Sequence, residues 1–271
     1  MSVLDTGAAP ATADGPSRPR PPRAGSRWWV KAVVPVLLLV AWWWSTAAGV
    51  FDRSQLPPPA DVWHAAQQLW SNGQLQTNIA ISVQRVLIGF ACGAVAGLVL
   101  GGLTGASRLL HDLLAPTLGA FRAVPSLAWV PLLGLWIGIG EPPKIVLVAI
   151  GAFFPVYTTV ASALSHLDPA LVEVGRAYGR RGIGLFTEVL LPATAPALLS
   201  GLRLGLAQSW LFLVAAELLS SSIGLGYQMI NGQNTSRTDQ VLLAILLLAL
   251  LGKGSDVVLG LAEGRVKRAR G

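Results

Sequence analysis

The stretch IAISVQRVLIGFACGAVAGLVLGGLTG, residues 79–105, decides the fold class of this chain. It holds one charged residue, Arg85, and exceeds the roughly 20 apolar residues that a helix needs to cross a bilayer. Glycine recurs at every fourth position, which places five glycines on one helical stripe roughly 24 Å long: Gly89, Gly93, Gly97, Gly101 and Gly105. Small residues at this spacing let another helix approach closely inside a bilayer. We therefore expect a membrane helix buried among others, whether the stripe is a generic packing face or a specific interface.

The composition extends this interpretation to the whole chain. Its 271 residues are 53% hydrophobic and 12% charged, whereas soluble domains carry about 25% charged residues. Proline interrupts one of the other apolar runs, at Pro125 and Pro131. We expect an all-α polytopic membrane protein of about six transmembrane helices in one domain, with further spans at residues 28–51, 116–139, 144–164, 195–219 and 240–261.

Polar segments separate these spans. Residues 1–27 resemble a disordered cytosolic tail, and residues 263–271 form a basic cytosolic tail. Residues 52–77 form an external loop, in which the apolar spacing predicts a short surface helix at 60–70. Residues 166–192 and 220–239 form two further loops. The core membrane domain is expected at residues 78–262.

Basic residues are distributed unevenly between the two sides of the membrane. Six spans put both termini on one side, together with twelve Lys or Arg, against three on the other side. The positive-inside rule therefore predicts that both termini and the 166–192 loop are cytosolic. This distribution also explains the net charge of +7 without a nucleic-acid partner.

The segment LVEVGRAYGRRGIGLFTEVLLP, residues 171–192, lies in this cytosolic loop. Leu171, Val174 and Tyr178 recur at helical intervals among basic residues. Glycine is the usual helix terminator, so we expect a short amphipathic helix that ends at Gly179. Such a helix suits docking into a groove of another protein, although a helix lying on anionic lipid has the same pattern.

This segment resembles the "EAA" loop of binding-protein-dependent ABC importer permeases, in which Glu-Ala-Ala precedes a glycine and a final Leu-Pro at fixed offsets. Glu173 takes the glutamate position, Val174 and Gly175 replace the two alanines, and Gly179 falls on the glycine. Val189 replaces an isoleucine before the Leu-Pro pair. The resemblance implies a coupling helix between spans four and five that docks on a cytosolic ATPase subunit through Leu171, Glu173, Val174, Gly175, Ala177, Tyr178, Gly179, Leu191 and Pro192.

The resemblance covers residues 78–262 and implies the type I ABC importer permease fold. The segments at 122–125, 128–132, 138–141, 153–157 and 251–253 are similar to the nitrate/sulfonate/taurine permease group, and most of all to aliphatic sulfonate permeases. It further implies a multi-pass cell-membrane subunit without an ATPase site or cofactor of its own. The implied partners are two ATPase subunits that hold ATP-Mg, an external solute-binding protein, and a second permease copy in a homodimer.

Charged residues inside apolar runs are costly and suggest function. Arg85, Arg122 and Arg203 could attract an anion such as a sulfonate. They could equally be structural, by snorkelling or by pairing with acidic residues such as Glu217, whose partner the sequence does not reveal. Lys253 and Asp256, three residues apart, could pair directly.

Two alternatives have less support. One is an intramembrane enzyme, for which the spans hold no serine–histidine, paired-aspartate or metal-ligand motif. An ion-gradient-driven secondary transporter would lead one to expect inverted repeats or paired intramembrane carboxylates, and neither is visible. The three histidines and the lone Cys92 match no metal-ligand spacing, so no metal site is expected. The identity of the cargo stays open, since the permease group includes carriers of nitrate, taurine, aliphatic sulfonates and pyrimidine-like precursors.

Overall fold

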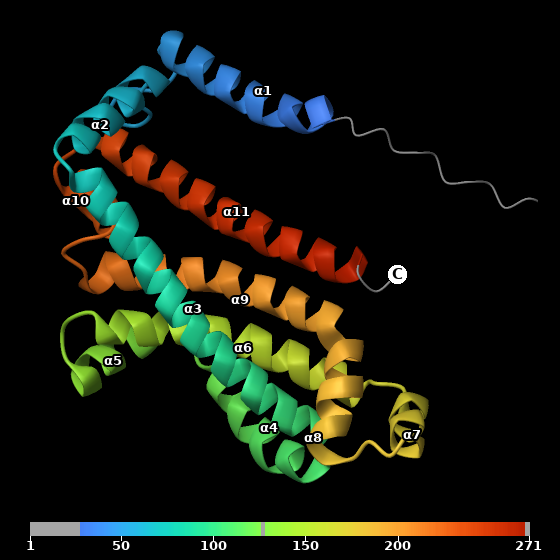
Figure 1. Ribbon diagram of the computed structural model, residues 1–271. Helices are drawn as coiled ribbons and strands as arrows, with labels where there is room; N and C mark the ends of the chain where they lie inside the picture. Colours follow the sequence, from blue (N-terminus) through green and yellow to red (C-terminus); the bar gives the residue numbers. More distant parts are fainter. Residues whose placement is uncertain (1–27, 126–127, 269–271) are drawn as a thin grey trace, which may run out of the picture.

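The computed structural model describes residues 28–125 and 128–268, and this part of the chain contains helices and no strand. The predicted tail at 1–27 and the last residues, 269–271, lie outside the described residues. The helices are α1 (Trp28–Ala47), α2 (Pro59–Ser71), α3 (Gln74–Ala106), α4 (Arg108–Ala123), α5 (Trp129–Ile137), α6 (Pro142–Ser165), α7 (Pro169–Ala177), α8 (Gly182–Leu185), the π-helical turn η2 (Phe186–Leu190), α9 (Leu191–Ser220), α10 (Leu225–Asn234) and α11 (Thr238–Arg268) (Figure 1).

Among the described residues, four helical stretches are long and apolar enough to cross a membrane: Gln74–Ala106, Pro142–Ser165, Phe186–Leu219 and Thr238–Gly264. They coincide with the predicted second, fourth, fifth and sixth spans. The apolar part of α1, Val33–Ala47, is shorter than these four. The surface helix expected at 60–70 is α2.

The predicted third span, 116–139, is not one helix. It begins earlier, at Arg108, and is divided into α4 and α5. Val124 is extended, with ψ at 126°, because the ring of the following Pro125 disfavours a helical conformation in the residue before it. Pro131 does not interrupt a helix. It lies in the first turn of α5, where a backbone N–H has no partner within the helix, so proline removes no hydrogen bond.

One predicted loop and the predicted C-terminal tail also differ from the structure. The 166–192 loop contains α7, and its second half is already helical, because α8 and η2 run continuously into α9. At the other end of the domain, α11 continues to Arg268, so the expected tail from residue 263 onwards begins as helix.

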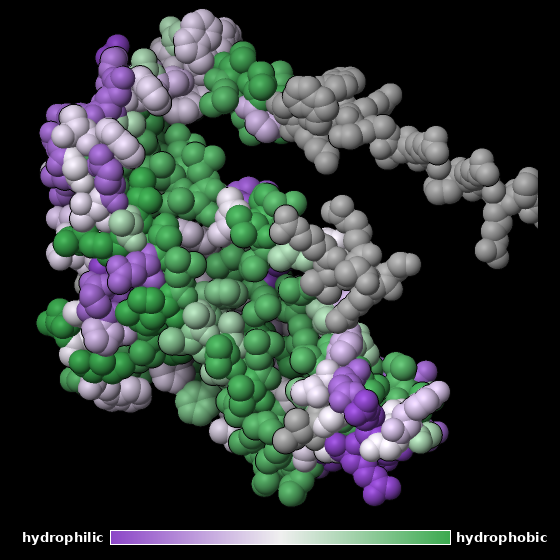
Figure 2. Space-filling model, viewed as in Figure 1, coloured by the Kyte–Doolittle hydropathy of each residue, from purple (hydrophilic) through white to green (hydrophobic). Residues whose placement is uncertain are grey.

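The core is formed by α3, α6 and α9, with α6 packed along both of the others and α11 lying against α9 (Figure 1). Val86 and Val148 meet Leu213 in one part of this core, and Ala94 meets Val156 in another. Many large apolar side chains stay exposed on the outer helices, for example on α1 and α11, and Figure 2 shows broad hydrophobic surface along the bundle. Such a surface suits contact with lipid.

The start of α1, the end of α11 and the short α7 lie at one end of the bundle (Figure 1). Helices α2 and α10 lie at the opposite end. The structure therefore brings the predicted coupling segment to the same end as the start of α1 and the end of α11.

Candidate functional site

The predicted coupling helix is α7, and both of its ends are capped. At its start the Asp168 carboxylate accepts a hydrogen bond from the Ala170 N–H (2.9 Å). At its end the Gly179 N–H donates to the Arg176 carbonyl (2.9 Å) and the Arg180 N–H donates to the Gly175 carbonyl (3.0 Å). This is a Schellman motif, which requires a left-handed residue, and Gly179 has φ at +74°. The helix ends where the glycine spacing predicts.

One face of α7 carries exposed apolar side chains. Leu171 is 43%, Val174 54% and Tyr178 82% exposed, although all three are apolar or aromatic. Positions i, i+3 and i+7 share one helical face. Glu173 and Ala177 are also exposed on this short helix. The result is a continuous apolar strip, which no described part of the chain covers.

The opposite face of α7 packs on the segment that follows. A side chain at Gly175 would meet Leu185 Cδ1 at 2.6 Å and Val189 Cγ2 at 3.1 Å, so the absence of a side chain lets α7 lie close to α8 and η2. An ion pair between Arg180 and Glu188 (2.8 Å) joins the same two parts.

The π-helical turn η2 connects this assembly to the membrane. The Leu191 N–H donates to the Phe186 carbonyl, five residues back, and Pro192, which follows, has no N–H to continue the ladder. From Leu191 and Pro192 the chain runs on as α9. The Phe186 ring also lies close to Gly102 of α3, where an added Cβ would be 3.5 Å away. The coupling segment thus contacts two core helices.

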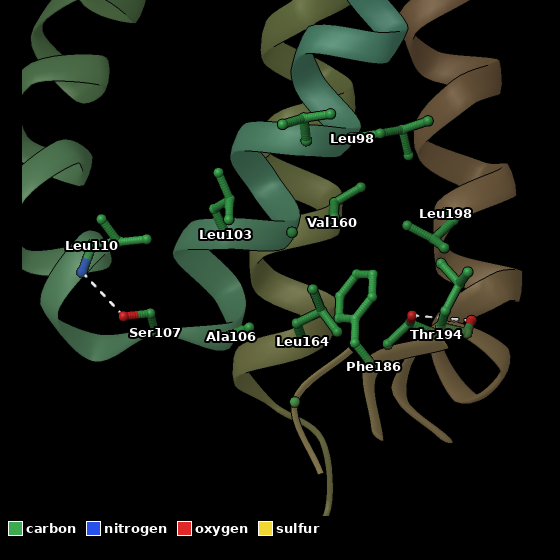
Figure 3. Close-up of a pocket in the computed structure, with 14 residues that line it drawn as sticks. Leu98, Leu103, Ala106, Ser107, Leu110, Val160, Leu164, Phe186, Thr194 and Leu198 are labelled. Carbon is green, nitrogen blue, oxygen red and sulfur yellow. Dashed lines mark hydrogen bonds between the residues drawn. The ribbon is translucent and has the colours of Figure 1, made fainter. Parts of the chain in front are cut away.

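An apolar cavity of about 640 Å³ lies beside Phe186, between α3, α6 and α9 (Figure 3). Leu98, Val160 and Leu198 point into it. The hydroxyl of Thr194, another residue lining the cavity, donates to the Leu190 carbonyl (2.9 Å). The cavity therefore offers little to a charged solute, because its lining is almost wholly apolar.

The glycine stripe of α3 lies against α6 over its whole length. An added Cβ at Gly89 would meet Val148 Cβ at 2.6 Å, at Gly97 it would meet the Phe153 carbonyl at 2.9 Å, and at Gly105 Leu164 Cβ at 2.7 Å. Gly93 and Gly101 make equivalent approaches to Ala152 and Val160. The stripe thus faces a helix of the same chain.

Sequence reasoning missed a second interface of this kind, between α6 and α9. An added Cβ at Gly201 would meet Thr159 Cβ at 2.9 Å, and at Gly205 it would meet Val156 Cγ2 at 2.9 Å. The i, i+4 spacing of these two glycines is the signal that could have revealed it.

Arg85 and Glu217 pair with each other in the interior. Arg85 donates to Glu217 (2.6 Å) and, through two nitrogens, to Glu141 (2.6 and 2.7 Å). Lys144 also donates to Glu141 (3.1 Å). Two cations thus face two anions, and this group offers no unbalanced positive charge to a solute.

The turn between α9 and α10 is built around Glu217. The Gly226 N–H and the Ser82 hydroxyl both donate to its carboxylate (2.8 Å each). Asn78 accepts from the Gly224 N–H (3.0 Å) and donates to Gln228 (3.0 Å). Only the tertiary structure reveals this network, because its members come from separate helices.

Arg203 is also paired, in this case between α9 and α11. It donates to Asp256 (2.9 Å) and to Glu263 (3.0 Å), and Asp256 accepts a further bond from Lys253 (3.1 Å). Arg122 differs from the other two arginines. It is exposed near the end of α4, and no acidic side chain among the described residues pairs with it. Within the described residues, no group of three or more His, Cys, Asp or Glu side chains is arranged to hold a metal ion.

Comparisons with known proteins agree on one family. The aliphatic sulfonates transport permease protein SsuC of Bacillus subtilis (strain 168) is 35% identical over 270 residues, covering 100% of this chain and 98% of that protein. SsuC of Escherichia coli (strain K12) is 41% identical over 230 residues, covering 85% and 88%. The taurine transport permease TauC of the same organism is 31% identical and covers 72% of this chain and 73% of its own length.

The fold has a counterpart among solved structures. An inward-facing structure of the MetNI methionine ABC transporter contains a chain that superposes with a TM-score of 0.60 at 22% identity, covering 75% of this chain and 97% of that chain. The two share the type I importer permease fold. Residues 93–268 match the family described as binding-protein-dependent transport system inner membrane components, so this chain is a member of the binding-protein-dependent ABC transporter permease family, in the group of sulfonate, nitrate and taurine permeases.

Proposed function

We propose that this chain forms the translocation pathway for a small anion, an aliphatic sulfonate, taurine or nitrate, delivered by an external binding protein. Two copies assemble with two cytosolic ATPase subunits, which hold ATP-Mg and drive transport. Both termini and α7 face the cytosol. The names of the relatives support the cargo class, since they transport aliphatic sulfonates and taurine.

The exposed apolar strip of α7 carries the proposal. Leu171, Val174 and Tyr178 would each contribute favourable free energy if a partner covered them, because burying apolar surface releases water. Arg176 and Arg181, which are exposed nearby, suit a partner with an acidic rim. A groove on an ATPase subunit provides such an environment.

The contacts of α7 indicate which membrane helices would respond if the ATPase subunit displaced α7. Because Gly175 has no side chain, α7 packs closely against Leu185 and Val189. These two residues lie in the helical segment that continues as α9. Phe186 touches α3 at Gly102. A displacement of α7 by its partner therefore acts on two of the three core helices.

Two substitutions on α7 test the proposal. Tyr178→Ala removes a side chain that is 82% exposed, so the fold should be unaffected. Gly179→Asp adds about 1 kcal/mol of backbone strain and a carboxylate beside the strip. We expect both variants to reach the membrane at normal levels and to lose the ATPase subunit or its cargo-stimulated hydrolysis.

Gly49→Asp provides the matched control. Gly49 also has a positive φ, +69°, and a Cβ added there would meet no other atom within 4 Å, but it lies at the opposite end of the bundle. It should carry similar strain and retain coupling. Normal ATPase binding and normal transport by both α7 variants would contradict the proposal. Transport that persists without the ATPase subunit and stops with an uncoupler would favour an ion-gradient-driven carrier instead.

A further inference from the structure

Three arginines lie in or near the apolar helices of the core, and their surroundings differ. Arg85 is balanced by Glu141 and Glu217, and Arg203 by Asp256 and Glu263. Arg122 has no acidic partner among the described residues. Its positive charge is therefore available to a solute anion.

Arg122 lies where two cavities meet. One cavity, of about 400 Å³, extends from Arg122 towards Trp129 of α5 and Gln208 and Phe212 of α9. The other, of about 350 Å³, extends towards His111 and His166, at the end of the bundle that holds α7. The two cavities adjoin at three residues that line both of them: Arg122, Phe154 and Thr158.

Together the cavities follow a long part of α6. The first begins beside Ile150 and the second ends beside His166, which at 1.5 Å per residue is about 24 Å along the helix axis. This length covers most of the roughly 30 Å hydrocarbon layer. The two cavities thus follow one another along α6, with Arg122 lining both.

The chemistry around Arg122 suits a compact oxyanion with a short apolar tail. A guanidinium binds the oxygens of such a group through two parallel hydrogen bonds. No Asp or Glu is found among the described residues that line either cavity, so nothing repels an anion. Trp129, Phe154 and Phe212 offer apolar surface to a hydrocarbon tail in the first cavity.

We propose that Arg122 is the residue of the pathway that selects for anions, by binding the oxyanion as it passes from the first cavity to the second. This inference rests on the proposed function, which supplies the anionic cargo. The Arg122–Phe154–Thr158 constriction divides the pathway into an outer and an inner chamber. Arg85 and Arg203 take no part in selection, because their charges are already neutralised.

The test compares three variants of the complete complex in proteoliposomes, with ATPase subunits and binding protein, and with radiolabelled ethanesulfonate as the probe. Arg122→Gln removes the positive charge. Arg122→Lys retains the positive charge but lacks the planar guanidinium that can form two parallel hydrogen bonds. Arg108→Gln is the matched control, because Arg108 is also exposed on α4 and lines neither cavity.

We expect Arg122→Gln to lower ethanesulfonate uptake about tenfold or more, since a hydrogen bond to a charged group is worth that factor. ATPase binding and hydrolysis stimulated by the binding protein should remain, which a merely structural defect would not allow. Arg122→Lys should restore part of the uptake, and Arg108→Gln should behave as wild type.

Three results would overturn the inference, and they are distinguishable from one another. If the wild-type complex takes up ethanesulfonate and Arg122→Gln does so equally well, Arg122 is not the selecting residue and the proposed function stands. The same holds if Arg122→Lys and Arg122→Gln lose complex assembly to the same extent. If the wild-type complex takes up neither ethanesulfonate, taurine nor nitrate, both the inference and the proposed function are wrong.

Discussion

Arg85 and Glu217 are almost fully buried, at 2% and 1% exposed, where an unpaired charge would be very costly. The structure avoids this cost by giving each charge several partners. Glu217 accepts from Arg85, Ser82 and the Gly226 N–H, so its oxygens are satisfied. The pair therefore holds the end of α9 and the following turn against α3.

Removing one member of this pair should be strongly destabilising. We expect Glu217→Ala to lower stability by about 3–5 kcal/mol, because it leaves the Arg85 charge partly uncompensated in the interior. The melting temperature of the purified complex measures this. Glu188→Ala, which breaks an exposed ion pair with Arg180, should cost about 1 kcal/mol or less. Equal melting temperatures for the two variants would contradict the structural role of Glu217.

Glu141, which pairs with Arg85, should make the stability of the folded protein sensitive to acid. Hydrogen bonds from the Arg85 guanidinium hold the pKa of the Glu141 carboxyl at about 2, below its ordinary 4.5. A pKa that is lower in the folded state stabilises the fold above about pH 4.5, and this stabilisation is lost as the pH falls towards 2.

The melting temperature should consequently fall on acidification from about pH 5 to pH 3, and less steeply in Glu141→Gln. The neutral amide has no proton to take up, so this part of the pH dependence disappears. An unchanged slope in Glu141→Gln would show that other groups control the acid response.

At the scale of helices, the glycine stripe determines how closely α3 and α6 approach. The atoms facing it are largely backbone carbonyls and Cβ atoms, such as the Phe153 carbonyl beside Gly97. Such atoms cannot rotate away from an added side chain. At Gly175, in contrast, the nearest atom is the end of the Leu185 side chain, which can move. The glycines of this chain thus differ in how well each would tolerate a side chain, according to which atoms lie beside it.

Gly97→Leu should reduce the membrane level and the stability of the protein. A Cβ alone would lie 2.9 Å from both the Phe153 carbonyl and Val156 Cβ, and overpacking of this kind costs about 1–3 kcal/mol or more. Immunoblots of membranes and the melting temperature measure the effect. Gly254→Leu on α11 is the control, since nothing lies near that position. Normal levels and transport in Gly97→Leu would refute the tight-packing role.

For the whole molecule, both ends of the helical bundle are chemically distinct. The twelve-to-three distribution of basic residues predicts one orientation in the membrane, and α7 lies at the same end of the bundle as the start of α1 and the end of α11. In the proposed orientation, α7 and the cavity beside His166 would face the cytosol, and α2 and α10 would face the proposed binding protein.

Cysteine labelling in spheroplasts tests this orientation. In a Cys92→Ser background, Arg181→Cys should react with an impermeant maleimide only after the membrane is opened, because it would lie in the cytosol. Arg53→Cys, whose native side chain is 80% exposed at the opposite end, should react from outside. The reverse pattern would overturn the orientation and leave the family assignment unaffected.

Features that depend on the order of residues along the chain could be predicted from the sequence alone. Four spans follow from their length and apolarity, and the family follows from residues at fixed offsets in one loop, such as Glu173 and Gly179. The stop of α7 at Gly179 was predictable for the same reason, since a left-handed turn needs a glycine at one position. For the third span, the interruption at Pro125 was predicted correctly and the one at Pro131 was not. The effect of a proline depends on its position, and Pro131 lies in the first turn of α5.

Which distant residues contact each other could be learned only from the packing of the helices. Arg85 and Glu217 are 132 positions apart, and many acidic partners were compatible with the sequence. The same holds for the partner of the glycine stripe and for the availability of Arg122, because a charge is free or paired only relative to its neighbours in space. Local propensity is encoded in neighbouring residues, whereas burial, pairing and cavities arise from the packing of helices that the chain brings together from far apart.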